Sequence, residues 1–143
     1  MTEIIVAATV AERAAGFAVR EQVFIGEQGV PADMEYDALD DADSTDHFLA
    51  RVGGEAVGAA RLTAEGGTAA LGRLAVLPRA RGAGLGAELV RAVEQRARER
   101  GFTAVELHAQ VPVLEFYRAL GYTAHGEEFE EAGIPHVEMR KEL

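Results

Sequence analysis

The sequence predicts one α+β domain, in which antiparallel strands come first and a strand–turn–helix unit follows. Apolar or alternating runs separated by glycine pairs fill residues 47–77, which is typical of hairpins. From Leu85 to Ala97 an apolar residue then recurs every four positions, which indicates an amphipathic helix. At 143 residues and 48% hydrophobic composition, the chain suits a single core, so we expect one domain over residues 1–143.

The N-terminal part is expected to hold a strand, a helix and a long connection. Residues 2–8 form a short apolar run that reads as the first strand. Thr9 and Glu12 have the spacing of a capping box, which predicts a helix from there to about Phe24. Periodicity is lost over residues 25–46, where glycine and proline interrupt the chain and acids abound, so we expect an irregular acidic segment.

Two hairpins are expected in the middle of the chain. Strands at 47–52 and 55–63 are joined by the glycine pair 53–54, which suits a tight turn because both of its central residues need a positive φ. A second turn at 65–67 leads into a strand over 68–77.

The C-terminal part repeats the alternation of strand and helix. Residues 103–109 read as a strand, and proline and glycine mark the two ends of a short helix over 112–121. Strands at 123–125 and 134–141 complete the chain, with an acidic turn expected at 127–131.

The stretch 71–86 joins an apolar strand to the helix that starts near Leu85 through a glycine-rich turn. N–H groups in the first turn of a helix lack intrahelical partners, and the helix dipole makes that end positive, so a phosphate fits there. Arg79 and Arg81 are expected to add positive charge. The glycines that would let the backbone approach a phosphate are Gly82, Gly84 and Gly86.

A dinucleotide site is a second interpretation of this turn. Gly82, Gly84 and Ala87 satisfy G-x-G-x-x-A, and Glu106 lies near the distance expected of a ribose-binding acid. That fingerprint belongs at the first strand of a repeated βαβ domain, whereas about half of this chain precedes it, which disfavours the interpretation. A third interpretation is a plain strand-to-helix connection without a ligand. Glycine at a helix start costs stability, so this interpretation leaves the glycines unexplained.

Composition excludes several kinds of chemistry and partner. The chain has no Cys, so disulfides, Cys-based metal sites and a cysteine acyl-enzyme are excluded, and we expect no metal. It has neither an apolar run long enough to span a membrane nor a signal segment, so we expect a cytoplasmic protein with no membrane partner. The net charge of −10 argues against nucleic acid.

Two motifs resemble those of the GNAT N-acetyltransferases, a family that binds acetyl-CoA. Arg81, Gly84 and Gly86 form R-x-x-G-x-G directly after a strand that ends in Val-Leu-Pro. Residues 110–122 are similar to the family pattern N-x-x-A-x-x-F-Y-x-x-x-G-F. The matching residues are Phe116, Tyr117 and Gly121, whereas Gln110, Val113 and Tyr122 depart from the pattern.

The resemblance implies a mixed, mostly antiparallel twisted sheet of six or seven strands with helices on both faces. It also implies direct acetyl transfer from acetyl-CoA to a primary amine of a small molecule or peptide. Tyr117 matches the tyrosine that protonates the departing thiolate, although it could equally belong to an apolar helix face. The residues that the resemblance places against acetyl-CoA are Leu74, Ala75, Val76, Arg81, Gly82, Ala83, Gly84, Leu85, Gly86 and Gln110.

No general base stands out in the sequence. Some GNAT enzymes carry a glutamate near the start of the strand that holds the cofactor, but this chain has Ala69 and Ala70 there. The candidates are Glu27, Glu35, Asp46, His47, His108 and His136, each of which could instead be structural. The missing base keeps a non-catalytic acyl-CoA-binding sensor open as an alternative function.

Two expectations concern the acceptor side. Arg73 lies in the middle of a strand and should either pair with a carboxylate such as Glu106 or face the acceptor. Residues 25–46 hold eight acids and no base, so this segment is expected to favour a cationic amine. The sequence does not decide between a monomer and a homodimer.

Overall fold

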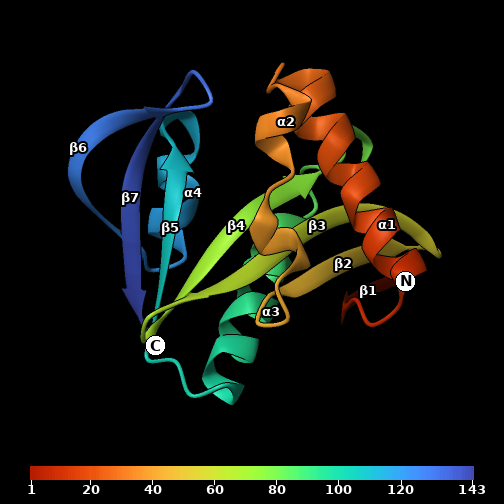
Figure 1. Cartoon of the computed structure of the whole chain (residues 1–143), viewed down its shortest axis with the longest axis horizontal. Helices are drawn as coiled ribbons and strands as arrows, with labels where there is room; N and C mark the ends of the chain where they lie inside the picture. The colour runs from red at the N-terminus through yellow and green to blue at the C-terminus, as the bar shows by residue number, and fades with distance from the viewer.

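A seven-stranded sheet organises the structure, a computed structural model that describes the backbone of residues 1–143 and every side chain except that of Glu65. The strand order is β1-β2-β3-β4-β5-β7-β6, and only β4 and β5 run parallel (Figure 1). The strands are β1 (Thr2–Val6), β2 (Asp46–Val52), β3 (Glu55–Glu65), β4 (Thr68–Val76), β5 (Ala104–Gln110), β6 (Thr123–Glu131) and β7 (Ile134–Glu142).

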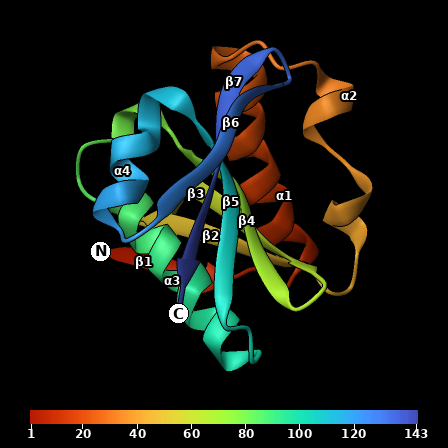
Figure 2. The same ribbon diagram turned by 90° about the vertical axis from the view of Figure 1, so that its left-hand side faces the viewer.

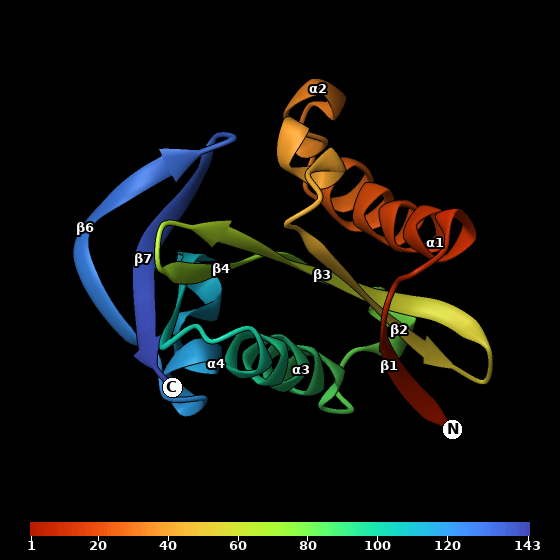
Figure 3. The same cartoon turned by 60° about the horizontal axis from the view of Figure 1, so that its bottom comes forward.

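Helices cover both faces of this sheet. In Figure 3, α1 and α2 lie above the sheet, and α3 and α4 lie below it. The α-helices are α1 (Val10–Arg20), α2 (Ala32–Glu35), α3 (Leu85–Glu99) and α4 (Leu114–Ala119). Shorter helical turns are η1 (Glu21–Glu27), η2 (Ala38–Asp41), η3 (Pro78–Ala80) and η4 (Val111–Val113). The expected class of fold is therefore confirmed.

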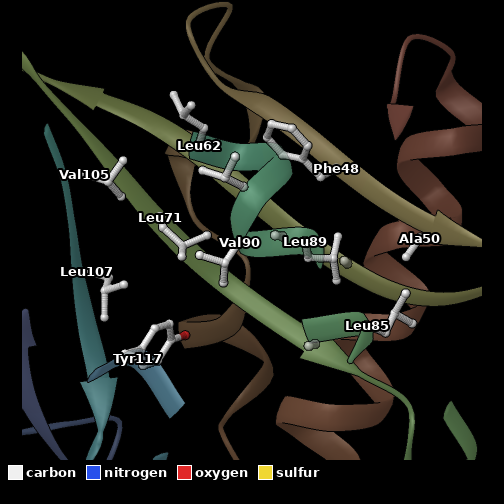
Figure 4. Close-up of a cluster of buried hydrophobic side chains, with 14 of the residues drawn as sticks. Phe48, Ala50, Leu62, Leu71, Leu85, Leu89, Val90, Val105, Leu107 and Tyr117 are labelled. Atoms are coloured by element: carbon white, nitrogen blue, oxygen red, sulfur yellow. The ribbon is translucent and has the colours of Figure 1, made fainter. Parts of the chain in front are cut away.

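The apolar stripe of α3 forms the main core. Leu89, Val90, Val93 and Ala97 are all fully buried, which confirms the four-residue periodicity expected from the sequence. Figure 4 shows Leu89 and Val90 among side chains from β2 to β5, including Leu62 of β3. Burying a side chain of this size contributes about 1.5–3 kcal/mol, so this face of α3 holds the helix against the sheet.

The first helix starts as expected but ends later. Thr9 Oγ1 accepts the N–H of Glu12, and the Glu12 carboxylate accepts the N–H of Thr9, both at 3.1 Å, so the capping box is confirmed. The prediction that the helix ends near Phe24 was wrong. It continues without interruption as the π-helix η1 and ends at Gly29, whose φ of +70° supplies the left-handed turn that stops it.

Two further expectations need correction. The segment 25–46 is not irregular throughout, because it contains the end of η1, the turn of α2, and η2 with a capping box of its own. Residues 127–131 are not a turn but the second half of β6, and the turn lies at Ala132 and Gly133, both with positive φ. Acids suit β6 because it is the edge strand, where charge discourages pairing with another chain.

The two parallel strands separate soon after they meet. β4 and β5 pair only from Ala69 opposite Val105 to Leu71 opposite Leu107. Beyond that point the two ribbons diverge, as Figure 1 shows, and their carboxyl ends no longer bond to each other. In Figure 2 the β6–β7 turn and α2 both lie at the upper end of the molecule.

Candidate active site

The candidate site lies where β4 and β5 diverge, between the carboxyl ends of the two strands. On one side, Leu74–Val76 continue β4; on the other, His108–Gln110 continue β5. β4 keeps its pairing with β3 through Ala59 opposite Ala75, so only its edge toward β5 is open. Backbone N–H and C=O groups along an unpaired strand edge need hydrogen-bonding partners, and an extended ligand can supply them.

The turn between β4 and α3 has the backbone of an anion site. Gly84 is the N-cap of α3 with a φ of 81°, and its cap position has no side-chain hydrogen bond. Gly82 also has a positive φ, and a Cβ added at either glycine would meet nothing within 4 Å. The first-turn N–H groups of this 15-residue helix are therefore accessible to a ligand.

Gly86 has a different reason to be a glycine. A Cβ at this position would lie 3.4 Å from Cζ of Phe116, so α4 approaches α3 closely here. Leu85 is buried in the core, whereas Ala83 is exposed in the turn. Of the expected turn residues, Gly82 and Gly84 thus suit ligand approach, and Leu85 and Gly86 suit packing.

The two arginines of the turn are engaged with the protein. Arg81 donates to the carbonyl of Val76 at 2.9 Å and forms two hydrogen bonds to Glu27, at 2.7 and 3.1 Å. Arg79 forms an exposed ion pair with Glu55 at 3.2 Å. Each of these arginines is thus paired with a glutamate, and the positive charge that both are expected to add to the turn stays a prediction.

Gln110, at the end of β5, faces the π-helix. Its Nε2 donates to Oε1 of Gln28 at 3.0 Å, and Gln28 Nε2 donates to Gln110 Oε1 at 3.3 Å. Together with the Glu27–Arg81 pair, this contact brings the end of η1 against both sequence motifs. Sequence reasoning missed the role of Glu27 and Gln28 in joining the motifs because nothing local signals a contact over 82 positions.

Tyr117 lies on α4 with a buried ring and an unpaired hydroxyl. The ring makes edge contacts with Phe116 and Tyr122, and Figure 4 shows it beside Leu107 of the core. Among the described residues, Arg51 Nε is the only side-chain nitrogen or oxygen that lacks both solvent and a partner. The Tyr117 hydroxyl, which has no partner there, therefore reaches solvent. Burial raises the pKa of Tyr117, so the phenol keeps its proton at neutral pH.

Most of the candidate bases are occupied. Glu27 pairs with Arg81, Glu35 with Arg20, and Asp46 with Arg96 and Arg100. His47 bonds through Nε2 to the carbonyl of Asp40 under α1. Only two candidates lie on the strands beyond the divergence, namely His108 and His136.

Arg73 contacts the acidic segment 25–46 and not Glu106. It donates to the carbonyl of Glu35 at 3.0 Å and to Asp37 Oδ2 at 3.3 Å, whereas Glu106 pairs with Arg140. Its φ of 54° and the register shift between Ala59 and Arg61 mark a bulge in β4. The expected partner of Arg73 was therefore wrong, although the expectation of a carboxylate pair was right.

Two buried arginines complete this network. Arg20 bonds Glu35 at 2.6 Å and Asp40 at 2.7 Å, and Arg61 bonds Asp37 at 2.7 Å and Asp40 at 3.0 Å. Burial alone would raise the pKa of Asp40, but hydrogen bonds from Arg20 and the Asp37 backbone, with the charge of both arginines, lower it to about 2. The acids of this segment therefore anchor it to α1 and the sheet.

Two features are absent from the residues that the structure describes. No helix there is long and apolar enough to cross a bilayer. In the same part of the chain, no three His, Asp or Glu side chains are placed to hold a metal ion.

Residues 6–143 match the family model described as an acetyltransferase (GNAT) domain. The chain is 39% identical over 127 residues to the uncharacterized N-acetyltransferase YjcF of Bacillus subtilis, covering 88% of this chain and 89% of the relative. It also matches two crystal structures. A Lactobacillus plantarum protein, provisionally an N-acetyltransferase, is 33% identical with a TM-score of 0.91, over 99% of this chain and 98% of the other. An acyl-CoA N-acyltransferase of Pseudomonas aeruginosa is 31% identical with a TM-score of 0.87, over the same shares.

The fold and the matches define an acyltransferase built on a split mixed sheet. The chain belongs to the GNAT acetyltransferase family, as its two motifs indicated, and it is an acetyltransferase enzyme.

Proposed function

We propose that this enzyme transfers the acetyl group of acetyl-CoA directly to a primary amine of a small molecule or peptide. The observation that carries the proposal is the open edge of β4 ending at the uncapped start of α3. An extended pantetheine arm can form hydrogen bonds with the edge of β4, and a pyrophosphate can bind the N–H groups at the start of α3. A dinucleotide suits the chain less well, because β4 and β5 are its only parallel pair among the described strands.

Each proposed contact to acetyl-CoA uses backbone groups. The N–H groups from Gly82 to Gly86 would bind the pyrophosphate, and the edge of Leu74–Val76 would bind pantetheine and the thioester oxygen. A hydrogen bond to that oxygen strengthens as negative charge develops on it, which lowers the barrier to attack. The guanidinium of Arg81 bonds both Val76 and Glu27, so it joins the end of β4 to η1. Because the Arg81 side chain is partly exposed, it can turn from Glu27 toward the phosphates when the cofactor binds.

Tyr117 is the proposed acid for the leaving thiolate. Burial raises the pKa of the phenol further above the usual value of a thiol, about 8.5, so complete proton transfer to sulfur is unfavourable at first. The hydroxyl would therefore stabilise the departing sulfur as a hydrogen-bond donor before the proton moves. Its lack of a partner among the described side chains leaves it available for this task.

A preference for a cationic acceptor now rests on overall charge alone. Five of the eight acids between 25 and 46 pair with arginines, so they present little net charge to an acceptor. Of the other three acids, Asp41 accepts a hydrogen bond from the Tyr36 hydroxyl, and Asp33 and Asp43 make no ion pair or side-chain hydrogen bond with the described residues. We therefore propose a primary amine as the acceptor, with any attraction for a cation coming from the net charge of −10.

Replacing Gly84 by Val is expected to abolish stabilisation by acetyl-CoA. A ligand that binds only the folded state adds about 2.7 kcal/mol at a hundredfold excess over its Kd, which thermal unfolding detects. A side chain at Gly84 would occupy the phosphate approach and strain a φ of 81°. The wild type should respond to acetyl-CoA and not to NAD.

Gly101→Val is the matched control for this experiment. Gly101 lies at the other end of α3, has a φ of 87° and also has nothing within 4 Å of an added Cβ. It should cost similar stability but keep the full response to acetyl-CoA. An undiminished response in Gly84→Val would show that the phosphates bind elsewhere.

A further inference from the structure

His136 lies in a row of side chains that crosses the C-terminal strands at the open end of the site. In the sheet it is opposite Gln110 of β5 and opposite Phe129 of β6. Its ring stacks on Phe129 with the planes at 24° and the centroids 6.0 Å apart. Because opposite residues point to the same face, His136 shares the face of Gln110, which turns toward η1 through Gln28.

The surroundings of His136 determine which ring nitrogen is free. Nδ1 lies 2.6 Å from the carbonyl oxygen of Ile134, and since a carbonyl can only accept, Nδ1 must carry the proton. In a neutral imidazole, Nε2 then holds the lone pair. The residue is only 7% exposed, yet Nε2, which has no partner among the described residues, is not sealed from solvent.

The row also lies level with the part of β4 expected to hold the thioester. Although β4 and β5 no longer pair beyond Leu71 and Leu107, counting three residues further along each strand brings Leu74 level with Gln110. The bulge at Arg73 shifts this by about one residue, toward Ala75. His136 lies one strand beyond β5, roughly 5 Å further across the sheet, and so at about the height along the strands where the thioester is proposed to bind.

We propose that His136 is the general base of the acetyl transfer, an inference that rests on the function proposed above. Nε2 takes a proton from the acceptor ammonium, and the freed amine nitrogen attacks the thioester carbon. The resulting tetrahedral intermediate keeps its new C–N bond and loses the C–S bond, which releases the thiolate. The sulfur takes the proton of Tyr117, and the phenolate regains one from the new amide nitrogen through water. The proton on Nε2 passes to solvent, so one proton is released for each amide and thiol formed.

His108 is the rival for this role. Its Nδ1 lies 2.8 Å from Oε2 of Glu131, but both side chains are about half exposed, and exposed pairs of this kind are weak. The contact with Glu131 also occupies Nδ1 of His108 and turns the ring toward the exposed edge strand β6. The titratable groups on the same face of these strands as His136 are Glu106 and His108 of β5, His125 and Glu131 of β6, and Glu138, Arg140 and Glu142 of β7.

His136→Asn isolates the lost lone pair, because the amide nitrogen can still donate to the Ile134 carbonyl. Its kcat/KM at pH 7 should fall by about a hundredfold or more, with the thermal response to acetyl-CoA retained. The loss should shrink as pH rises and solvent deprotonates the amine instead. His108→Asn, the matched control, should change kcat/KM by less than about fivefold.

Three results would overturn the assignment: near-normal turnover in His136→Asn, a loss that stays constant with pH, or the large loss in His108→Asn instead. Nitrogen-15 NMR of the wild type tests it without any acceptor. The expected tautomer of the neutral His136 ring carries its proton on Nδ1, and a neutral ring with its proton on Nε2 would contradict the role. A wild type that binds acetyl-CoA but acetylates no amine would refute the proposed function, which is a separate outcome.

Discussion

Replacing Asp40 by Asn is expected to lower the free energy of unfolding by about 3–5 kcal/mol, the cost of breaking a buried ion pair from one side. Asp40 is 5% exposed and accepts hydrogen bonds from both Arg20 and Arg61, which are themselves buried. An amide would leave two buried guanidinium groups without their shared counter-charge. Chemical denaturation monitored by circular dichroism measures the change.

The control for Asp40→Asn is Glu55→Gln, which breaks the exposed pair with Arg79 and should cost about 0–1 kcal/mol. Acid titration of the wild type gives a second readout. The pKa of Asp40 falls from an unfolded value near 4 to about 2 in the folded protein. The contribution of Asp40 to the free energy of unfolding is therefore complete above pH 4 and is lost as the pH falls toward 2. If Asp40→Asn unfolds like the control, the network does not anchor the segment.

Tyr117→Phe is expected to reduce kcat by about a hundredfold or more, the usual effect of losing a catalytic acid. Acetyl-CoA affinity and thermal stability should change little, because the hydroxyl makes no hydrogen bond to any described residue and the ring stays in the core. Steady-state kinetics at saturating acetyl-CoA, with thermal unfolding alongside, gives both quantities.

Tyr122→Phe is the matched control and should show the opposite pattern. The Tyr122 hydroxyl donates to the buried Glu94 at 2.8 Å, so its loss should cost about 1–3 kcal/mol of stability and leave kcat unchanged. If kcat is also unchanged in Tyr117→Phe, the tyrosine is part of the core and nothing more.

Local patterns in the sequence predicted the elements that depend on local physics. The four-residue period predicted α3, the glycine pair at 53–54 predicted the β2–β3 hairpin, and Thr9 with Glu12 predicted the start of α1. The glycine-rich turn and the aromatic motif on α4 were also recognisable, because a left-handed backbone and close packing limit which residues fit there.

Features that depend on distant contacts were not predictable in this way. Asp40 meets Arg61 across 21 positions and Arg73 meets Asp37 across 36, so composition showed an acidic segment where the fold has internal ion pairs. The same limit hid the contact between Gln28 and Gln110. A strand was predicted at 123–125, but its continuation to Glu131 was missed because an edge strand can carry exposed acids in place of an alternating apolar pattern.

The central claim is tested most directly by measuring thiol release and amine acetylation together, with acetyl-CoA and a panel of primary amines. The account predicts that at least one amine triggers release of free CoA thiol well above the rate without amine, and that mass spectrometry finds one acetylated amine for each thiol. Binding of acetyl-CoA with no amine acetylated at any pH tested would contradict the account and favour an acyl-CoA-binding sensor.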